Sequence, residues 1–139
     1  MIGTYSENAR QTKYCSAIKK ALKVKGHATN FELLAELRHI FPELSATTVH
    51  RATARLASRG EIALAPAAKD GSMRYDFKLT PHDHFLCSNC DQLRDIDVKT
   101  KLNTILKRSI CDCQVSGRLT IEGLCKLCAG SLLQLSKGE

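Results

Sequence analysis

The sequence has no long hydrophobic run, no glycine-rich phosphate loop and no nucleophile motif. No apolar stretch approaches the ~20 residues that a membrane-spanning helix needs, and the first residues lack the apolar core of a secretory signal. The missing loop and nucleophile argue against an enzyme. Internal repeats and low-complexity segments are also absent. We therefore expect a cytoplasmic protein that has no membrane partner and is not an enzyme.

The composition is that of a globular protein with an uneven charge. The chain has 139 residues, of which 43% are hydrophobic and 25% charged, enough for one ordinary domain or two small ones. Residues 1–80 hold 13 Lys/Arg against 7 Asp/Glu, whereas residues 81–139 hold 8 against 7. A basic first half beside a nearly neutral second half favours nucleic-acid binding by the first.

Seven cysteines, an odd number, fit poorly with a pure disulfide framework. Four of them form two Cys-x-x-Cys pairs, Cys87 with Cys90 and Cys125 with Cys128. In a reducing compartment four such thiolates are the tetrahedral ligand set of a structural zinc ion, with no position left for a substrate. Because 34 residues separate Cys90 from Cys125, a folded segment must bring the two pairs together.

Three helices and two strands are predicted in the first half. An amphipathic helix over residues 7–25 ends at Gly26, and Thr29 begins a capping box for a second helix that continues to Phe41 and stops at Pro42. A third helix over 46–58 is capped by Ser45, and strands over 61–65 and 72–77 follow. This order predicts a winged helix-turn-helix with 46–58 as its recognition helix.

The second half is predicted to be a small α/β unit. We expect a short strand into Cys87, strands near 92–97 and 118–122, and helices over 99–109 and after Cys128. Zinc would supply the stability that so small a core lacks. The predicted α+β protein is thus divided into a DNA-binding winged-helix domain (1–78), a hinge (79–81) and a metal-binding dimerisation domain (82–139).

His82 and His84 lie just before the first cysteine pair and outside the zinc set. With the nearby acids Asp76 and Asp95 they form a harder ligand set than four thiolates, one suited to Fe(II), Mn(II) or Zn(II). The sequence therefore predicts a second metal site beside the first.

The chain resembles the ferric uptake regulator (Fur) family over nearly its full length. The resemblance rests on motifs in both halves: His-x-His-x-x-Cys-x-x-Cys at 82–90, Cys-x-x-Cys at 125–128, Thr-Thr-Val-His-Arg at 47–51, Arg-Tyr-Asp at 74–76 and His-x-Thr at 27–29. It implies a homodimeric, metal-responsive repressor that binds double-stranded DNA at AT-rich inverted repeats through paired winged helices.

The resemblance also implies roles for individual residues. The regulatory Fe(II) or Mn(II) ligands would be His27, Asp76, His82, His84 and Asp95, a set of three histidines and two aspartates typical of the peroxide-sensing PerR branch. In that branch peroxide oxidises a ligand histidine, here His27 or His82, and DNA is released. DNA contacts would come from Thr48, His50, Arg51 and Arg55.

Two positions depart from the family pattern. His50 replaces the usual tyrosine of the recognition helix, and Cys15 stands where an arginine is usual. Two alternatives to peroxide sensing stay open: an iron- or manganese-responsive repressor, and a zinc-stabilised DNA-binding module with no sensing role. A zinc deaminase is disfavoured because the chain has His-x-His where that chemistry needs His-x-Glu.

Overall fold

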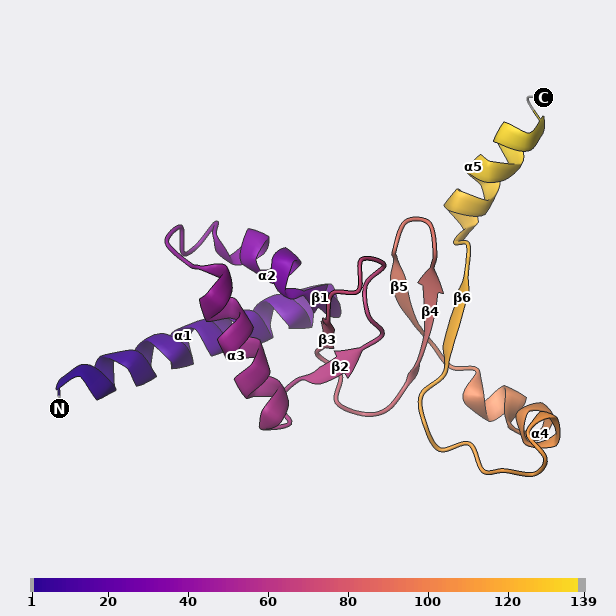
Figure 1. The fold of residues 1–139 in the computed structure, drawn as a ribbon, viewed down its shortest axis with the longest axis horizontal. Coiled ribbons are helices and arrows are strands. Elements are labelled where there is room, and N and C mark those ends of the chain that lie inside the picture. The colour runs from indigo at the N-terminus through magenta and orange to yellow at the C-terminus, as the bar shows by residue number, and fades with distance from the viewer. Residues whose placement is uncertain (1, 138–139) are drawn as a thin grey trace. The chain divides into compact units, whose positions relative to one another are not determined.

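The computed structural model describes the backbone of residues 2–137 and the side chains of residues 13–131. The chain forms two compact units, Met1–Leu79 and Thr80–Glu139, which we call the N-terminal and C-terminal units. Figure 1 shows the helices and strands of each unit. None of the described helices is long and apolar enough to cross a membrane. The expected α+β fold class is confirmed, with five helices and two small sheets in the described part of the chain.

The three helices of the N-terminal unit are α1 (Ile2–Lys25), α2 (Asn30–Leu37) and α3 (Ala46–Ser58). Gly26, at φ 83°, follows α1 in the left-handed conformation that often ends a helix. The expected caps are present: the Thr29 side chain accepts a hydrogen bond from the Glu32 N–H, and Ser45 accepts one from the Thr48 N–H. These caps fix where α2 and α3 begin.

The second helix ends earlier than predicted. It stops at Leu37, and the N–H groups of His39 and Ile40 bond to carbonyls three residues back. The Arg38 side chain donates to the Leu44 carbonyl at 3.0 Å and closes this turn. Ile40, which lies within the predicted helix but beyond the observed one, is 67% exposed. The chain therefore leaves the helix before it reaches Pro42.

A three-stranded sheet completes the N-terminal unit, in the order β1-β3-β2. The predicted hairpin is present as β2 (Ala63–Ala65) and β3 (Arg74–Asp76), each shorter than expected. β1 (His27–Thr29) is an additional strand that the sequence did not predict, because three residues are too few for a period-two pattern. This strand pairs antiparallel with β3 and sets His27 directly opposite Asp76.

Eleven buried hydrophobic residues form the core of the N-terminal unit. They come from all three helices, the sheet and two connecting segments: Ile18, Leu22, Ala28, Leu33, Leu37, Leu44, Val49, Ala52, Leu56, Ile62 and Tyr75. Val49, Ala52 and Leu56 lie along one side of α3 and are buried in this core. One side of α3 thus packs in the core, and the opposite side is exposed.

The C-terminal unit contains a sheet in the order β5-β4-β6, with β4 (Asp83–Cys87) at its centre. β5 (Leu93–Ile96) is antiparallel to β4, and β6 (Thr120–Gly123) is parallel to it. α4 (Lys99–Ser109) connects β5 to β6. The last helix, α5 (Lys126–Lys137), begins before Cys128 instead of after it. The side chains of α5 beyond residue 131 lie outside the described part of the structure.

Candidate metal centres and DNA-binding face

The pairing of β4 with β6 brings the two cysteine pairs together. In the parallel register Cys87, at the end of β4, lies opposite Gly123, two residues before Cys125. The Ser88 N–H donates to the Gly123 carbonyl at 2.8 Å and extends this pairing by one step. Cys90 lies in the turn after β4, and Cys128 lies in the first turn of α5. The folded segment required between the pairs is therefore β5, α4 and β6.

The four thiols fit a zinc ion. Their Sγ atoms all lie within 4.8 Å of one another, and Cys90 and Cys125 are 3.8 Å apart. A tetrahedron with Zn–S bonds of about 2.3 Å has edges of about 3.8 Å. That separation is far longer than the ~2.05 Å of a disulfide bond, and all seven cysteines are free thiols. The structure thus contains a four-cysteine site of the zinc type.

Backbone N–H groups favour the thiolate form that zinc requires. The Cys90 and Cys125 N–H groups point at the Cys87 sulfur, at 3.5 and 3.3 Å, and lower the pKa of Cys87 to about 6. The Asn89 side-chain amide donates to the Cys128 sulfur at 3.3 Å. Donors aimed at thiolate sulfurs are the outer-shell contacts that orient the ligands of a metal site.

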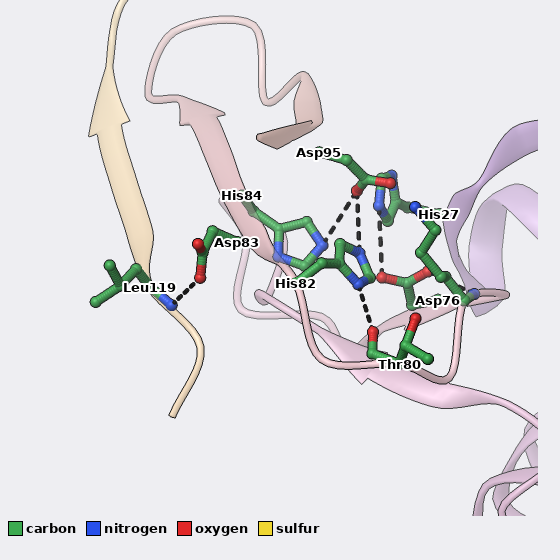
Figure 2. Close-up of polar contacts among 9 residues, drawn as sticks. His27, Asp76, Thr80, His82, Asp83, His84, Asp95 and Leu119 are labelled. Carbon is green, nitrogen blue, oxygen red and sulfur yellow. Dashed lines mark hydrogen bonds and ion pairs between the residues drawn. The ribbon is translucent and has the colours of Figure 1, made fainter. Parts of the chain in front are cut away.

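A second cluster in the C-terminal unit contains His82, His84 and Asp95. His84 and Asp95 are directly opposite each other on β4 and β5. The Nε2 atoms of His84 and His82 lie 3.4 and 3.1 Å from the same carboxylate oxygen of Asp95 (Figure 2). Three donor atoms thus converge from β4, from β5 and from the residue just before β4. His84 is fully buried, while the Asp95 side chain is 40% exposed.

The Thr80 carbonyl orients one ring of this cluster. It lies 2.8 Å from His82 Nδ1, as the dashed line in Figure 2 shows. If Nδ1 carries the proton that this contact requires, the lone pair of Nε2 faces Asp95. In many metal sites a neutral histidine binds the metal through one ring nitrogen and donates a hydrogen bond to a carbonyl through the other.

The structure also reveals a role for Asp83, which the sequence analysis did not single out. Its carboxylate accepts hydrogen bonds from the backbone N–H groups of Lys99 and Leu119, at 3.1 and 3.0 Å. Asp83 is buried and fastens β4 to the start of α4 and to the segment entering β6. Strand alternation places Asp83 on the opposite side of β4 from His82 and His84. The alternation of side chains along this strand is the sequence signal that could have separated Asp83 from the two histidines.

The N-terminal unit contains its own histidine–aspartate pair. His27 and Asp76 face each other across β1 and β3, with 3.6 Å between His27 Nε2 and an Asp76 oxygen (Figure 2). Asp76 is buried, and its other carboxylate oxygen accepts the Lys78 N–H at 2.8 Å. Two donors alone do not complete a metal site, and both belong to elements whose pairing the sequence did not predict.

The predicted DNA contacts on α3 lie in three different environments. His50 and Arg51 are exposed on the side of α3 away from the core. Thr48 is half-buried, and its hydroxyl lies 2.9 Å from that of Ser45 in the helix cap. Arg55 is half-buried and faces α1, with which it lines a groove. The exposed contacts are therefore His50 and Arg51.

An exposed polar network holds His50. Its Nδ1 lies 3.4 Å from the side-chain nitrogen of Asn30, at the start of α2, and the buried Thr53 hydroxyl lies 2.9 Å from the Asn30 side-chain oxygen. This chain of contacts joins the first turn of α2 to the exposed side of α3.

Comparison with known proteins agrees with this architecture. A model of the ferric uptake regulator family matches residues 6–114. No protein of curated function matches the chain. The fold is similar to those of solved regulators that share less than 25% identity with the chain, three of which share 18–21%, so these likenesses concern the fold alone.

Three of these structures show the extent of the likeness. The Helicobacter pylori ferric uptake regulator Fur, described with three functional metal binding sites, is 18% identical, with a TM-score of 0.68 over 93% of this chain and 94% of that one. The Francisella tularensis ferric uptake regulator with iron is 19% identical (TM-score 0.67; 84% and 91%). The Campylobacter jejuni peroxide stress regulator is 21% identical (TM-score 0.65; 91% and 98%).

Proposed function

Because the chain belongs to the ferric uptake regulator family, whose members are metal-responsive transcription regulators, we propose that it is a metal-dependent repressor of the PerR type. It binds double-stranded DNA as a homodimer in the cytoplasm. The observation that carries the proposal is the presence of two chemically different kinds of ligand cluster, the first made of four thiols and the second of imidazoles with carboxylates.

The N-terminal unit is the proposed DNA-binding domain. Its recognition helix exposes His50 and Arg51, and the surrounding unit has a large excess of basic residues. Basic side chains neutralise phosphates, while side chains on the exposed face of such a helix read base edges in the major groove. Two copies of this unit in a dimer would bind an AT-rich inverted repeat.

The four cysteines are the proposed ligands of a structural zinc ion. Thiolates fill all four positions of a tetrahedral ion, so this site has no opening for a substrate or an effector. We assign it the task of holding the C-terminal dimerisation domain together.

The two histidine–aspartate clusters are the proposed ligands of one regulatory ion, Fe(II) or Mn(II). The C-terminal unit offers His82, His84 and Asp95, and the N-terminal unit offers His27 and Asp76. Nitrogen and carboxylate ligands suit these metals, which take five or six ligands, more than either cluster provides. Ligands from both sides of the hinge at 79–81 would favour one closed arrangement of the dimer, which is the DNA-binding state.

Peroxide sensing is the proposed signal. Fe(II) at this site would promote the transfer of one oxygen atom from hydrogen peroxide to a ligand imidazole, with water as the other product. His27 and His82 are the two candidates, since each pairs with a carboxylate at a half-buried position. An oxidised ring binds the ion poorly, so the two units would separate and the DNA would be released.

Mass spectrometry tests this part of the proposal. Zinc-loaded protein is given Fe(II) and then a low concentration of peroxide, with a Mn(II)-loaded sample as control. We expect one added oxygen on His27 or His82 in the Fe(II) sample alone, together with loss of DNA binding. Unmodified histidines with intact DNA binding would reject peroxide sensing in favour of an iron- or manganese-responsive repressor.

A metal-binding measurement tests the ligand set itself. We expect Asp95→Ala to weaken Mn(II) binding to the zinc-loaded protein by at least about tenfold, since it removes the oxygen that His82 and His84 share. Asp97→Ala is the matched control, because Asp97 is exposed and bonds only to Thr100 among the described contacts. Equal affinities of the two variants would favour the zinc-stabilised module without a sensing role.

A further inference from the structure

A groove between α1 and α3 remains outside both metal centres. It encloses about 650 Å³, which is within the range of 300–1,000 Å³ typical of small-molecule sites. Its walls come from one side of α1, the C-terminal end of α3, the segment before β2 and the residue that follows β3. The lining residues are Cys15, Ser16, Lys19, Lys20, Lys23, Arg55, Leu56, Arg59, Glu61 and Phe77.

The groove is strongly basic. Five of its ten lining residues are lysine or arginine, and one is acidic. Glu61 forms an ion pair with Lys19, with 3.2 Å between Lys19 Nζ and Glu61 Oε1. Among the described side chains, the other four cations form no ion pair with a carboxylate: Lys20, Lys23, Arg55 and Arg59. A concave surface that gathers several cations focuses a positive potential and attracts anions.

The helix dipole explains only part of this charge. Cations are favoured in the last turn of a helix, which accounts for Lys23 on α1 and Arg55 on α3. Lys19 and Lys20 lie farther from the end of α1 and gain little from the dipole. Their position opposite Arg55 and Arg59 brings like charges together, an arrangement that a bound polyanion would stabilise.

One wall of the groove is apolar. Leu56 is buried in the core, and Phe77 is half-buried and packs against it. Cys15 adds an uncharged group, because burial raises the pKa of its thiol in spite of the opposing effect of Arg55. A ligand that combines negative charge with a flat ring would match both walls, since arginine side chains also stack on planar rings.

The shape argues against duplex DNA as the occupant. Phosphates of a duplex lie on the outside of a stiff, convex cylinder, and they contact exposed or protruding side chains. Of the two exposed predicted contacts on α3, His50 does not line this groove, and Arg51 lines a smaller pocket beside it that shares Cys15 and Arg55. A small flexible anion can enter a cavity that the backbone of a duplex cannot.

We propose that the groove between α1 and α3 binds a nucleoside polyphosphate, with its phosphates on Lys20, Lys23, Arg55 and Arg59 and its base against Phe77. Arg55 belongs both to this groove and to the proposed DNA contacts, so the bound nucleotide would lower DNA affinity. That consequence rests on the proposed function, whereas the binding itself does not.

Calorimetric titration of the zinc-loaded full-length protein with ATP, without DNA or a regulatory metal, tests the site. Lys20→Ala/Lys23→Ala removes two exposed cations from the groove, and Lys13→Ala/Lys25→Ala removes the same charge from the same helix outside it. We expect saturable binding by the wild type, at least a tenfold loss in the first variant, and less than a twofold change in the second. Zinc content is measured after each titration, because nucleotides chelate metals.

Each other outcome contradicts the proposal. Absence of saturable ATP binding at millimolar concentration would reject the site, and equal losses in the two double variants would show non-specific attraction by net charge. Inorganic tripolyphosphate that binds as tightly as ATP would overturn the assignment of a nucleoside. Because no operator DNA is present, failure here leaves the proposed repressor function unaffected, and failure of peroxide sensing leaves this site unaffected.

Discussion

The two units of this chain are stabilised in different ways. The N-terminal unit buries eleven hydrophobic residues in one cluster. Among the described side chains, the C-terminal unit buries only Leu86, Cys87 and Cys125 as hydrophobic residues, two of which belong to the thiol cluster. A unit of this size has little core to bury, and a metal bound by the four cysteines would supply the stability that apolar packing gives elsewhere. The zinc-type site would thus stabilise the C-terminal unit as the hydrophobic core stabilises the N-terminal unit.

Removal of zinc should affect the two units unequally, and this is the largest effect we expect. Binding of zinc to thiolate sites contributes on the order of 10–16 kcal/mol, more than a small domain has to spare. Cys125→Ser, or a strong chelator, should therefore unfold the C-terminal unit and leave the N-terminal unit folded. Hydrogen exchange followed by mass spectrometry measures both units in one sample.

The control for this experiment is Cys111→Ser, which changes an exposed cysteine outside the thiol cluster. It should leave the protection of both units unchanged. Persistent protection of β4 and β6 in Cys125→Ser would contradict the role assigned to the metal.

A cavity in the apolar core should destabilise the N-terminal unit and leave the C-terminal unit folded. Leu33→Ala removes a fully buried side chain of α2 and should destabilise the N-terminal unit by about 2–5 kcal/mol. Denaturant unfolding at constant zinc concentration measures the loss. Phe31→Ala, on the same helix but 80% exposed, should cost less than about 1 kcal/mol. Similar losses in the two variants would show that Leu33 is not part of a close-packed core.

The C-terminal unit should also depend on Asp83. Replacement by alanine leaves the N–H groups of Lys99 and Leu119 without their carboxylate partner, which should cost about 1.5–3 kcal/mol. Thermal unfolding of the zinc-loaded protein measures this difference. Asp97→Ala removes an exposed carboxylate nearby and should have little effect. An unchanged midpoint for Asp83→Ala would mean that β4 is held by its strand pairing alone.

The smallest expected effect concerns a helix cap. Ser45→Ala removes the acceptor for the Thr48 N–H and should destabilise the N-terminal unit by about 1 kcal/mol. Ser58→Ala, at the other end of α3, removes a hydroxyl that bonds only to the Arg55 carbonyl and should change stability less. Equal values from chemical denaturation would contradict the importance of the cap.

The sequence predicted the parts of the fold whose signals are local. Ser45 and Thr29 marked two helix starts, and the alternation and periodicity around them predicted the order of most helices and strands. The strand at His27–Thr29 was missed because it forms only by pairing with Asp76 and its neighbours, far along the chain. The early end of α2 depends on the Arg38 contact with Leu44, which is also invisible to a short sequence window.

The candidate sites show the same difference between local sequence signals and contacts between distant residues. The spacing of Cys87 and Cys90 predicts a shared ligand target, but only the parallel register of β4 and β6 explains how Cys125 reaches them. Resemblance to a family supplied the pairing of His27 with the other regulatory ligands. The sequence showed no groove between α1 and α3, because a cavity depends on how two helices pack.

The central claim is that the imidazole and carboxylate ligands form a switch separate from the four-cysteine site. It is tested most directly by the affinity of zinc-loaded protein for its operator, selected from a random duplex pool, with and without Mn(II). We predict a rise of about 5- to 150-fold in the wild type and none in Asp95→Ala, at unchanged zinc content. Equal affinity of the wild type with and without Mn(II) would contradict the account.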